Sequence, residues 1–405
     1  MAFCIVVASC DESSQPLRAA GAMLALNPKL MVMLGDDPYY NAALTWAQYT
    51  TTRVTTSSTA NSIKDRVHAM WTKPGWREIL AERAAGRLRI SWAGGDDHRW
   101  ADSADHTVTQ AQSGGGPTGA TTQAQVNAIA TAWYTAHREL ANLYWDYPTA
   151  TSMAGYNGDM PSEPAAQGAA MAASAFPVIY HYLDFSGDGA IGGTHARVIV
   201  PDLITYRSPI TATDDASKVC MGAVQEAWFL AAVRQAWAAG FKHIVIASSK
   251  KLYIKDSDGR YGSGENSDTW GAYATERDRV FGALHADGIR VTVMSGDRHT
   301  PNVVRRTVAD HAAAFDSLDL CACPTGVQNN DTGQGDTLGQ LWLRSAPSKY
   351  DSVFGALEFA DDDTLRLSIC NAATGSRRWT CTVAPRSNEP LYDAGRSRVV
   401  SATVS

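Results

Sequence analysis

Short runs of aliphatic and β-branched residues alternate with helical patterns along much of this chain, and this alternation most constrains its fold. The first unit comprises "FCIVVAS" (3–9), a helical pattern around 16–26, and "LMVML" (30–34). That order is typical of a βαβ unit, whose two strands lie parallel in one sheet. The same alternation returns further along as a helix over 222–240, a strand over 243–249, a helix over 270–286 and a strand over 289–295.

Antiparallel pairs are predicted between and after these units. Runs over 176–185 and 194–202 flank a Gly-Asp-Gly turn and are expected to form a hairpin. Three β-rich runs close the sequence at 353–359, 364–370 and 377–384. Parallel units combined with hairpins predict the α/β class, with two packed mixed β-sheets flanked by helices in four layers.

The domain organisation is predicted from length and local composition. At roughly 150 residues per domain, 405 residues would suit two or three domains or one large α/β domain with insertions. Residues 103–124 are rich in Gly, Ser, Thr and Gln, and 150–174 are rich in Ala and Gly. We therefore expect a single catalytic domain over 1–405, with a mainly helical and loop insertion at about 103–175.

Charge and hydropathy exclude several classes of partner. The net charge of -6 argues against a nucleic-acid partner, because that affinity is built on an excess of Lys and Arg, and it favours metal cations. No run approaches the ~18 apolar residues of a membrane helix. The start "MAFCIVVASC" lacks the basic residues of a signal peptide, and although "VASC" is similar to a lipoprotein box, a first core strand and a cytoplasmic protein are expected.

Seven cysteines are scattered over the chain, which does not suggest a disulfide framework. Most are expected to be free thiols in a reducing compartment, except any that carry chemistry. In "CAC", Cys321 and Cys323 are expected to project from opposite faces of a strand and to form neither a zinc pair nor a disulfide.

Chemically reactive side chains follow four separate predicted strands. These strand ends are "ASC" at Cys10, "LGDDPYY" at Asp36, "WAGGDDHRWAD" at Asp96 and "MSGDRH" at Asp297. Ligands of α/β sheets bind beyond the carboxyl ends of the strands, so one crevice could gather all four. Carboxylates with little compensating Lys or Arg repel one another, and bound cations would relieve that repulsion.

The ligand types indicate two unlike metals. A thiolate from Cys10 and a phenolate from Tyr39 favour a transition metal, whereas oxygen ligands at Asp36 and Asp102 suit calcium, magnesium or manganese. Taken singly, Cys10 is more often a buried thiol and Tyr39 a capping aromatic. The joint pattern at the strand ends favours a site in which two unlike metals share Asp36 as a ligand.

In these motifs and in others along the sequence, the chain resembles the PhoD-like (alkaline phosphatase D) metallophosphoesterases of the calcineurin-like superfamily. The motifs that carry the resemblance are, in order, "ASC", "GDDPY", "GDDH", "PDLITYR", "GAVQEAW", "DTWGAY" and "GDRH". The resemblance implies a two-sheet metallophosphoesterase core, ferric iron beside calcium, and phosphoester hydrolysis. Manganese, zinc or magnesium would also suit such ligands.

The resemblance assigns roles residue by residue. The metal roles that it implies fall on Cys10, Asp36, Tyr39, Asp297 and His299, and Asp102 is added to them as the oxygen ligand named above. Catalytic roles fall on Asp97 and His98, and substrate contacts on Arg207, Asp268 and Trp270. Three positions depart from the family pattern: Gly95 replaces a Trp, Ile204 replaces an Arg, and an expected Asn is replaced around Asp102.

We expect hydrolysis of phosphodiesters or phosphomonoesters of small molecules by a hydroxide bound at a dinuclear metal site. His98 is the candidate for protonating the leaving group, because imidazole titrates near neutral pH. The alternatives are a phospholipase D-type or phosphotriester hydrolase, or a metal-stabilised binding protein without catalysis. Ile204 would favour bulky esters if it faced the pocket, and would only fill space if it faced the core.

Overall fold

The structure is a computed structural model of the chain. The residues that it describes are 3–11, 17–35, 71–92, 122–126, 128, 180–185, 196–210, 212–252, 269–297, 301–306, 308, 315–323, 340–343, 352–387, 392–393 and 398–399.

The first of two large sheets combines strands from the N-terminal and the C-terminal parts of the chain. Its six strands lie in the order β13-β12-β11-β1-β2-β3. Their bounds are β1 (Phe3–Ala8), β2 (Leu30–Met33), β3 (Arg89–Trp92), β11 (Val353–Phe359), β12 (Leu365–Asn371) and β13 (Arg377–Val383). The N-terminal strands β1, β2 and β3 are parallel to one another, whereas β11 pairs antiparallel with β1.

The second sheet contains seven strands in the order β10-β8-β9-β7-β6-β5-β4. Their bounds are β4 (His181–Phe185), β5 (Ala196–Val200), β6 (His243–Ser248), β7 (Thr292–Ser295), β8 (Asn302–Arg306), β9 (Ser317–Cys321) and β10 (Gln340–Leu343). Strands β5, β6, β7 and β9 are parallel, and β4 pairs antiparallel with β5, as predicted for the hairpin. A separate short pair joins β14 (Tyr392–Asp393) to β15 (Arg398–Val399).

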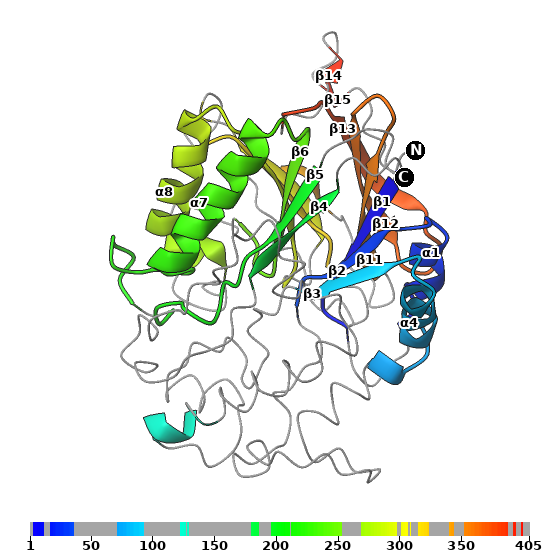
Figure 1. Cartoon of the computed structure of the whole chain (residues 1–405), viewed down its shortest axis with the longest axis horizontal. Coiled ribbons are helices and arrows are strands. Elements are labelled where there is room, and N and C mark those ends of the chain that lie inside the picture. The colour runs from blue at the N-terminus through cyan, green and yellow to red at the C-terminus, as the bar shows by residue number, and fades with distance from the viewer. Residues whose placement is uncertain are drawn as a thin grey trace.

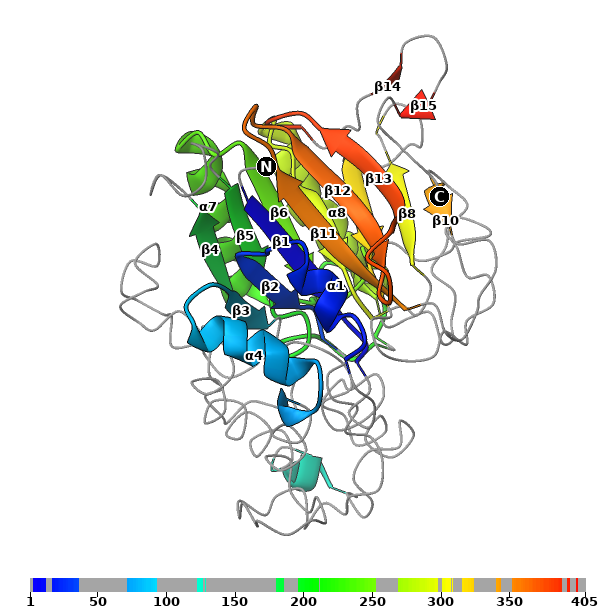
Figure 2. The same cartoon turned by 90° about the vertical axis from the view of Figure 1, so that its right-hand side faces the viewer.

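Helices cover the outer faces of both sheets. Figure 1 shows α7 (Ala223–Ala238) and α8 (Ala274–Ala286) outside the second sheet, and α1 (Ala20–Leu24) and α4 (Trp76–Ala84) outside the first. A 3₁₀ turn, η1 (Trp270–Tyr273), leads into α8. The predicted fold class is confirmed: the protein has two packed mixed sheets with helices outside, in four layers (Figures 1 and 2).

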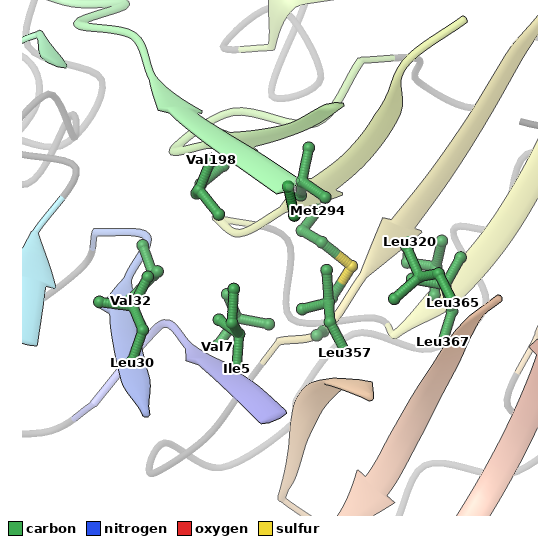
Figure 3. Close-up of a cluster of buried hydrophobic side chains, with 14 of the residues drawn as sticks. Ile5, Val7, Leu30, Val32, Val198, Met294, Leu320, Leu357, Leu365 and Leu367 are labelled. Carbon is green, nitrogen blue, oxygen red and sulfur yellow. The ribbon is translucent and has the colours of Figure 1, made fainter. Parts of the chain in front are cut away.

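The main core lies between the two sheets. Strand alternation directs Ile5 and Val7 of β1 toward Val198 of β5 and Met294 of β7, and all four are buried (Figure 3). Rings continue this core, since Phe3 stacks on Phe359 at a centroid distance of 4.2 Å and on Phe185 at 5.1 Å. The apolar face of each sheet is thereby removed from water, which fixes the sheets against each other.

A second core cluster packs α7 and α8 against the outer face of the second sheet. Phe229 of α7, Phe281 of α8 and Trp270 meet there edge to face. In the described part of the chain, no helix is both long and apolar enough to cross a membrane. The single domain over 1–405 and its insertion at 103–175 stay predictions, because most of 103–175 lies outside the described residues.

Candidate metallophosphoesterase site

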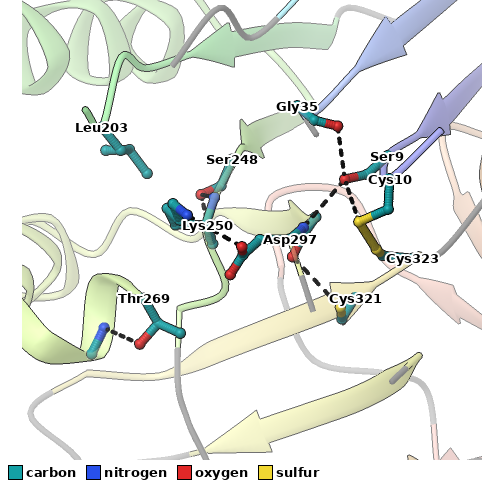
Figure 4. A network of polar contacts seen from close by, with 12 residues as sticks. Ser9, Cys10, Gly35, Leu203, Ser248, Lys250, Thr269, Asp297, Cys321 and Cys323 are labelled. Atoms are coloured by element: carbon teal, nitrogen blue, oxygen red, sulfur yellow. Dashed lines mark hydrogen bonds and ion pairs between the residues drawn. A yellow bond between two sulfur atoms is a disulfide. The ribbon is translucent and has the colours of Figure 1, made fainter. Parts of the chain in front are cut away.

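Three strand ends converge on Ser9, which follows β1. The Ser9 hydroxyl donates to the Gly35 carbonyl at 3.2 Å and accepts from the Asp297 N–H at 3.2 Å. The Cys10 N–H also donates to the Gly35 carbonyl, at 3.1 Å. Gly35 follows β2 and Asp297 follows β7, so Ser9 joins the carboxyl ends of strands from both sheets (Figure 4). The predicted convergence of Cys10 with Asp297 is therefore visible in the structure.

Gly296 permits this close approach. A Cβ added to Gly296 would lie 2.4 Å from the Ser9 Oγ and 3.0 Å from the Leu34 Cβ. Real Cβ atoms do not tolerate such distances, so the end of β7 can reach β1 and β2 only with glycine at this position. The glycine of the "SGDRH" stretch is thus needed for the geometry of the site.

The two described candidate ligands both have left-handed backbone conformations. The φ angle is 58° at Cys10 and 70° at Asp297. Such conformations are uncommon for residues other than glycine and concentrate at functional sites. Cys10 and Asp297 each turn the chain at the end of a strand. The residues before them, Ser9 and Gly296, donate hydrogen bonds to the carbonyls of Gly35 and Ser248 at the ends of neighbouring strands.

A buried lysine lies against Asp297. The Lys250 Nζ is 3.2 Å from the Asp297 Oδ1, with 1% of the lysine side chain and 9% of the aspartate side chain exposed. Ser248, at the end of β6, fixes the lysine backbone, because its hydroxyl accepts from the Lys250 N–H and donates to the Lys250 carbonyl. Sequence reasoning missed Lys250. Its position after a predicted central strand, "HIVIASSK", was the available signal.

Asp319 supports the site from behind. Its completely buried carboxylate accepts from the Ser295 hydroxyl at 2.6 Å and from the Leu252 N–H at 3.1 Å. Ser295 ends β7, and Leu252 follows Lys250 by two residues. A buried carboxyl group on β9 therefore holds the two segments that carry Asp297 and Lys250.

Cys10 forms a disulfide with Cys323, across 313 residues of sequence and a Cα–Cα distance of 6.3 Å. The bond between Cys323 and Cys10 was not predicted, because the expectation concerned only Cys321 and Cys323. Strand β9 ends at Cys321, so Cys323 lies beyond the strand, and Cys10, Cys321 and Cys323 form one buried cluster. The other described cysteines are free thiols, as expected.

Most of the predicted site residues cannot be placed. The residues Asp36, Tyr39, Asp97, His98, Asp102, Asp268 and His299 lie outside the described part of the chain. Within the described part, no three His, Cys, Asp or Glu side chains are grouped closely enough to hold a metal ion. Asp297 offers a carboxylate suited to a cation, whereas Cys10 in its disulfide does not offer the thiolate that an iron ligand requires.

The two described candidates for substrate contact are buried. Trp270 is completely buried between Phe229 and Phe281, which does not favour a substrate contact by its ring, and that role stays an untested prediction. Arg207 is 3% exposed. Ile204 is completely buried, which favours the interpretation that it fills space in the core.

Comparisons with known proteins agree with this fold. Residues 185–336 match the family model described as PhoD-like phosphatase. A solved structure titled "Structure of PhoD" superimposes with a TM-score of 0.58 at 14% sequence identity, covering 98% of this chain and 73% of that chain. A comparison with curated protein sequences found no match.

Two further solved structures were found. A purple acid phosphatase from yellow lupin (Lupinus luteus) has 10% identity and a TM-score of 0.47, covering 94% of this chain and 53% of that one. A dimetal phosphatase from Danio rerio has 9% identity and a TM-score of 0.42, with 95% and 99% covered.

The matched segment 185–336 includes strands β5, β6, β7, β8 and β9 of the second sheet, together with Lys250, Asp297 and Cys323. It therefore contains one side of the convergence at Ser9. The predicted resemblance is confirmed to this extent: residues 185–336 match the PhoD-like phosphatase model, and the chain shares its fold with the solved PhoD structure.

Proposed function

We propose that this protein hydrolyses small-molecule phosphoesters at a dinuclear metal site beyond the ends of β1, β2 and β7. The observation that carries the proposal is the convergence of Cys10 and Asp297, which two separate sequence motifs supply and which Ser9 joins. Iron and calcium are the proposed metals, held by Cys10, Asp36, Tyr39, Asp102, Asp297 and His299. Such cations neutralise phosphoryl oxygens and lower the pKa of a water molecule.

The chain's own groups have distinct parts in this proposal. The Asp297 carboxylate supplies negative charge at the end of β7, in a backbone conformation fixed by Ser9. The Lys250 ammonium supplies a fixed positive charge beside it, of the kind that pairs with phosphate oxygens. Asp97 and His98 are the proposed catalytic pair, with His98 giving a proton to the leaving oxygen, while Arg207, Asp268 and Trp270 keep their proposed substrate roles.

The first test combines elemental analysis with one conservative substitution. Asp297→Asn keeps the shape of the side chain and tolerates the left-handed backbone, but it removes the charge. After reduction and incubation with metal, we expect the variant to bind at least one metal equivalent less than wild type. Its kcat/KM on an aryl phosphate and on the methyl ester of that phosphate should be less than about 1% of the wild-type value.

The matched control is Asp287→Asn, at an exposed carboxylate that pairs with Arg234 on the outer helices. This variant should keep wild-type metal content and turnover. Asp36→Ala extends the test to the proposed shared ligand. Full activity of Asp297→Asn, or an active wild-type protein without bound metal, would refute the proposed function.

A further inference from the structure

The Cys10–Cys323 disulfide joins the two sheets at the proposed site. Cys10 follows β1 of the first sheet, and Cys323 follows β9 of the second sheet by two residues. Both side chains are completely buried, and the Cys10 Sγ lies 3.4 Å from the Ser9 hydroxyl that binds Asp297 (Figure 4). The sulfur chemistry of this pair therefore takes place directly at the converging strand ends.

A disulfide and a thiolate ligand exclude each other at Cys10. The metal ligand is the thiolate, and a sulfur that is bonded to another sulfur lacks its charge. We infer that Cys10 and Cys323 form a thiol–disulfide switch, in which the reduced pair admits the thiolate-bound metal and the oxidised pair excludes it. This inference rests on the proposed function, because it takes Cys10 as a ligand of that site.

The oxidation step balances with a peroxide as oxidant. The two thiols and one hydrogen peroxide give one S–S bond and two water molecules, so each sulfur loses one electron and the peroxide gains both. The thiol protons leave in the water. A dithiol reverses the step by exchange, and it becomes a cyclic disulfide itself while Cys10 and Cys323 regain their protons.

The surrounding cysteines make this pair distinct. Cys321 belongs to the same buried cluster but keeps a free thiol, which donates to the Gly296 carbonyl at 3.8 Å. Cys4 and Cys381 lie within strands of the first sheet, and burial raises the pKa of both thiols far above the usual range. These three cysteines stay thiols, whereas Cys10 and Cys323 are bonded to each other.

The experiment measures iron uptake in defined redox states of the full chain. Wild-type protein is treated with hydrogen peroxide or with dithiothreitol, freed of reagent under nitrogen, incubated with iron(II) and desalted. Alkylation followed by mass spectrometry identifies the blocked cysteines. We expect the oxidised form, with Cys10 and Cys323 blocked, to bind less than about one tenth of the iron that the reduced form binds.

Two serine variants separate the switch from general oxidative damage. Cys323→Ser leaves Cys10 without its partner, so iron uptake should be the same before and after peroxide. Cys321→Ser changes a cysteine of the same cluster that is not in the disulfide, so its uptake should still fall after peroxide and recover with dithiothreitol. The comparison of oxidised with reduced wild type holds even if a variant folds poorly.

The outcomes distinguish this inference from the proposed function. Equal iron uptake by oxidised and reduced wild type, with phosphoester turnover intact, overturns the switch and leaves the function standing. Loss of uptake by Cys323→Ser after peroxide also overturns it. Absence of both iron and turnover in every redox state overturns the switch together with the proposed metal site.

Discussion

At the scale of single residues, the site combines backbone strain with charge pairing. Cys10 and Asp297 both have positive φ angles, and the Ser9 hydroxyl lies 3.4 Å from the Cys10 Sγ and accepts a hydrogen bond from the Asp297 N–H. A strained conformation of this kind costs about 1–3 kcal/mol and persists only where the surroundings impose it. Here the surroundings are the ends of three strands, so the cost is met by the packing of both sheets.

Lys250 and the proposed metal compete for the same carboxylate. Removal of one partner from a buried ion pair is destabilising by about 3 kcal/mol, so metal-free Lys250→Met should unfold at lower urea concentration than wild type. A cation that binds Asp297 then restores the missing charge. By linkage, the variant should bind iron more tightly than wild type, by roughly tenfold or more, yet turn over phosphoesters more slowly.

The control for this prediction is Lys218→Met. Lys218 is also a buried lysine, but its ammonium donates to the Ile210 carbonyl at 2.8 Å and lies over the Tyr273 ring. That variant should lose stability without a change in iron affinity. Unfolding curves with and without iron decide the question, and an equal stabilisation of wild type and Lys250→Met by iron would contradict the competition.

Sequence motifs predicted some residues of the site, and the residues that they missed were missed for physical reasons. The motif ends predicted that Cys10 and Asp297 would meet, because parallel strands place their carboxyl ends at one edge. Lys250 belongs to no motif that pairs it with Asp297, since 47 residues separate the two. The partner of Cys10 could not be deduced either, because connectivity between cysteines depends on the fold.

At the scale of elements, helix α8 is tied to the segment before α7 through a buried carboxylate. Glu276 of α8 is 1% exposed and accepts from the backbone N–H groups of Cys220 and Met221. Burial is the main cause that raises its pKa to about 7, from a usual value of 4.5, and the two hydrogen bonds act in the opposite direction. At a pH between about 4.5 and 7, Glu276 is therefore mostly protonated in the folded protein and mostly ionised in the unfolded chain.

This shift predicts a dependence of stability on pH. Between about pH 4.5 and pH 7 the native state binds more protons than the unfolded state, so the contribution of Glu276 to stability falls as the pH rises. The contribution is complete below the unfolded pKa and lost above the folded one. Glu276→Gln keeps an acceptor oxygen without the charge, and its stability should exceed that of wild type by roughly 3 kcal/mol at pH 8 but not at pH 4.5.

Urea unfolding at four pH values between 4.5 and 8 tests this prediction through the difference between the two proteins. Glu82→Gln serves as control, because Glu82 lies on the surface of α4 and pairs with Arg87. The difference in free energy of unfolding between Glu82→Gln and wild type should not change with pH across this range. A Glu276→Gln difference that is also flat would show that the buried carboxyl titrates normally.

Elements with strong periodicity were the ones that the sequence predicted well. The run over 243–249 became β6, and the helical pattern over 222–240 became α7. Strands β8 and β10 were not predicted, because β10 has only four residues and β8 begins three residues after the end of the site motif "GDRH". Their position at one edge of the second sheet depends on pairing with β9, which local patterns do not encode.

At the scale of the whole molecule, the site depends on the spacing of the two sheets. Cys10 follows strand β1 of the first sheet, whereas Asp297 and Cys323 follow strands β7 and β9 of the second. The core between the sheets holds them close to one another, through side chains such as Val7 and Met294. The proposed metal ligands can therefore keep their geometry only while this core keeps its thickness.

Gly355 of β11 lies in close contact with its neighbour strand β1 and with the second sheet. A Cβ at this position would lie 2.4 Å from the Val7 Cγ2, 2.5 Å from the Met294 Cε and 2.9 Å from the Ala322 Cβ. Val7 and Met294 each precede a site residue by three positions, and Ala322 directly precedes Cys323. One added methyl group would thus press on all three segments that carry the described site.

We predict that Gly355→Ala separates the sheets slightly and lowers the free energy of unfolding by about 1–3 kcal/mol, as overpacking does in other cores. Because the push falls on the strands behind Cys10 and Asp297, iron affinity and kcat/KM of the folded variant should fall at least tenfold. Gly21→Ala is the matched control, since Gly21 is exposed on α1 with no atom within 4 Å of an added Cβ. There alanine should leave the site unchanged and raise stability by up to about 1 kcal/mol through helix propensity. A Gly355→Ala protein with wild-type stability and iron affinity would show that the core absorbs the methyl group without moving the sheets.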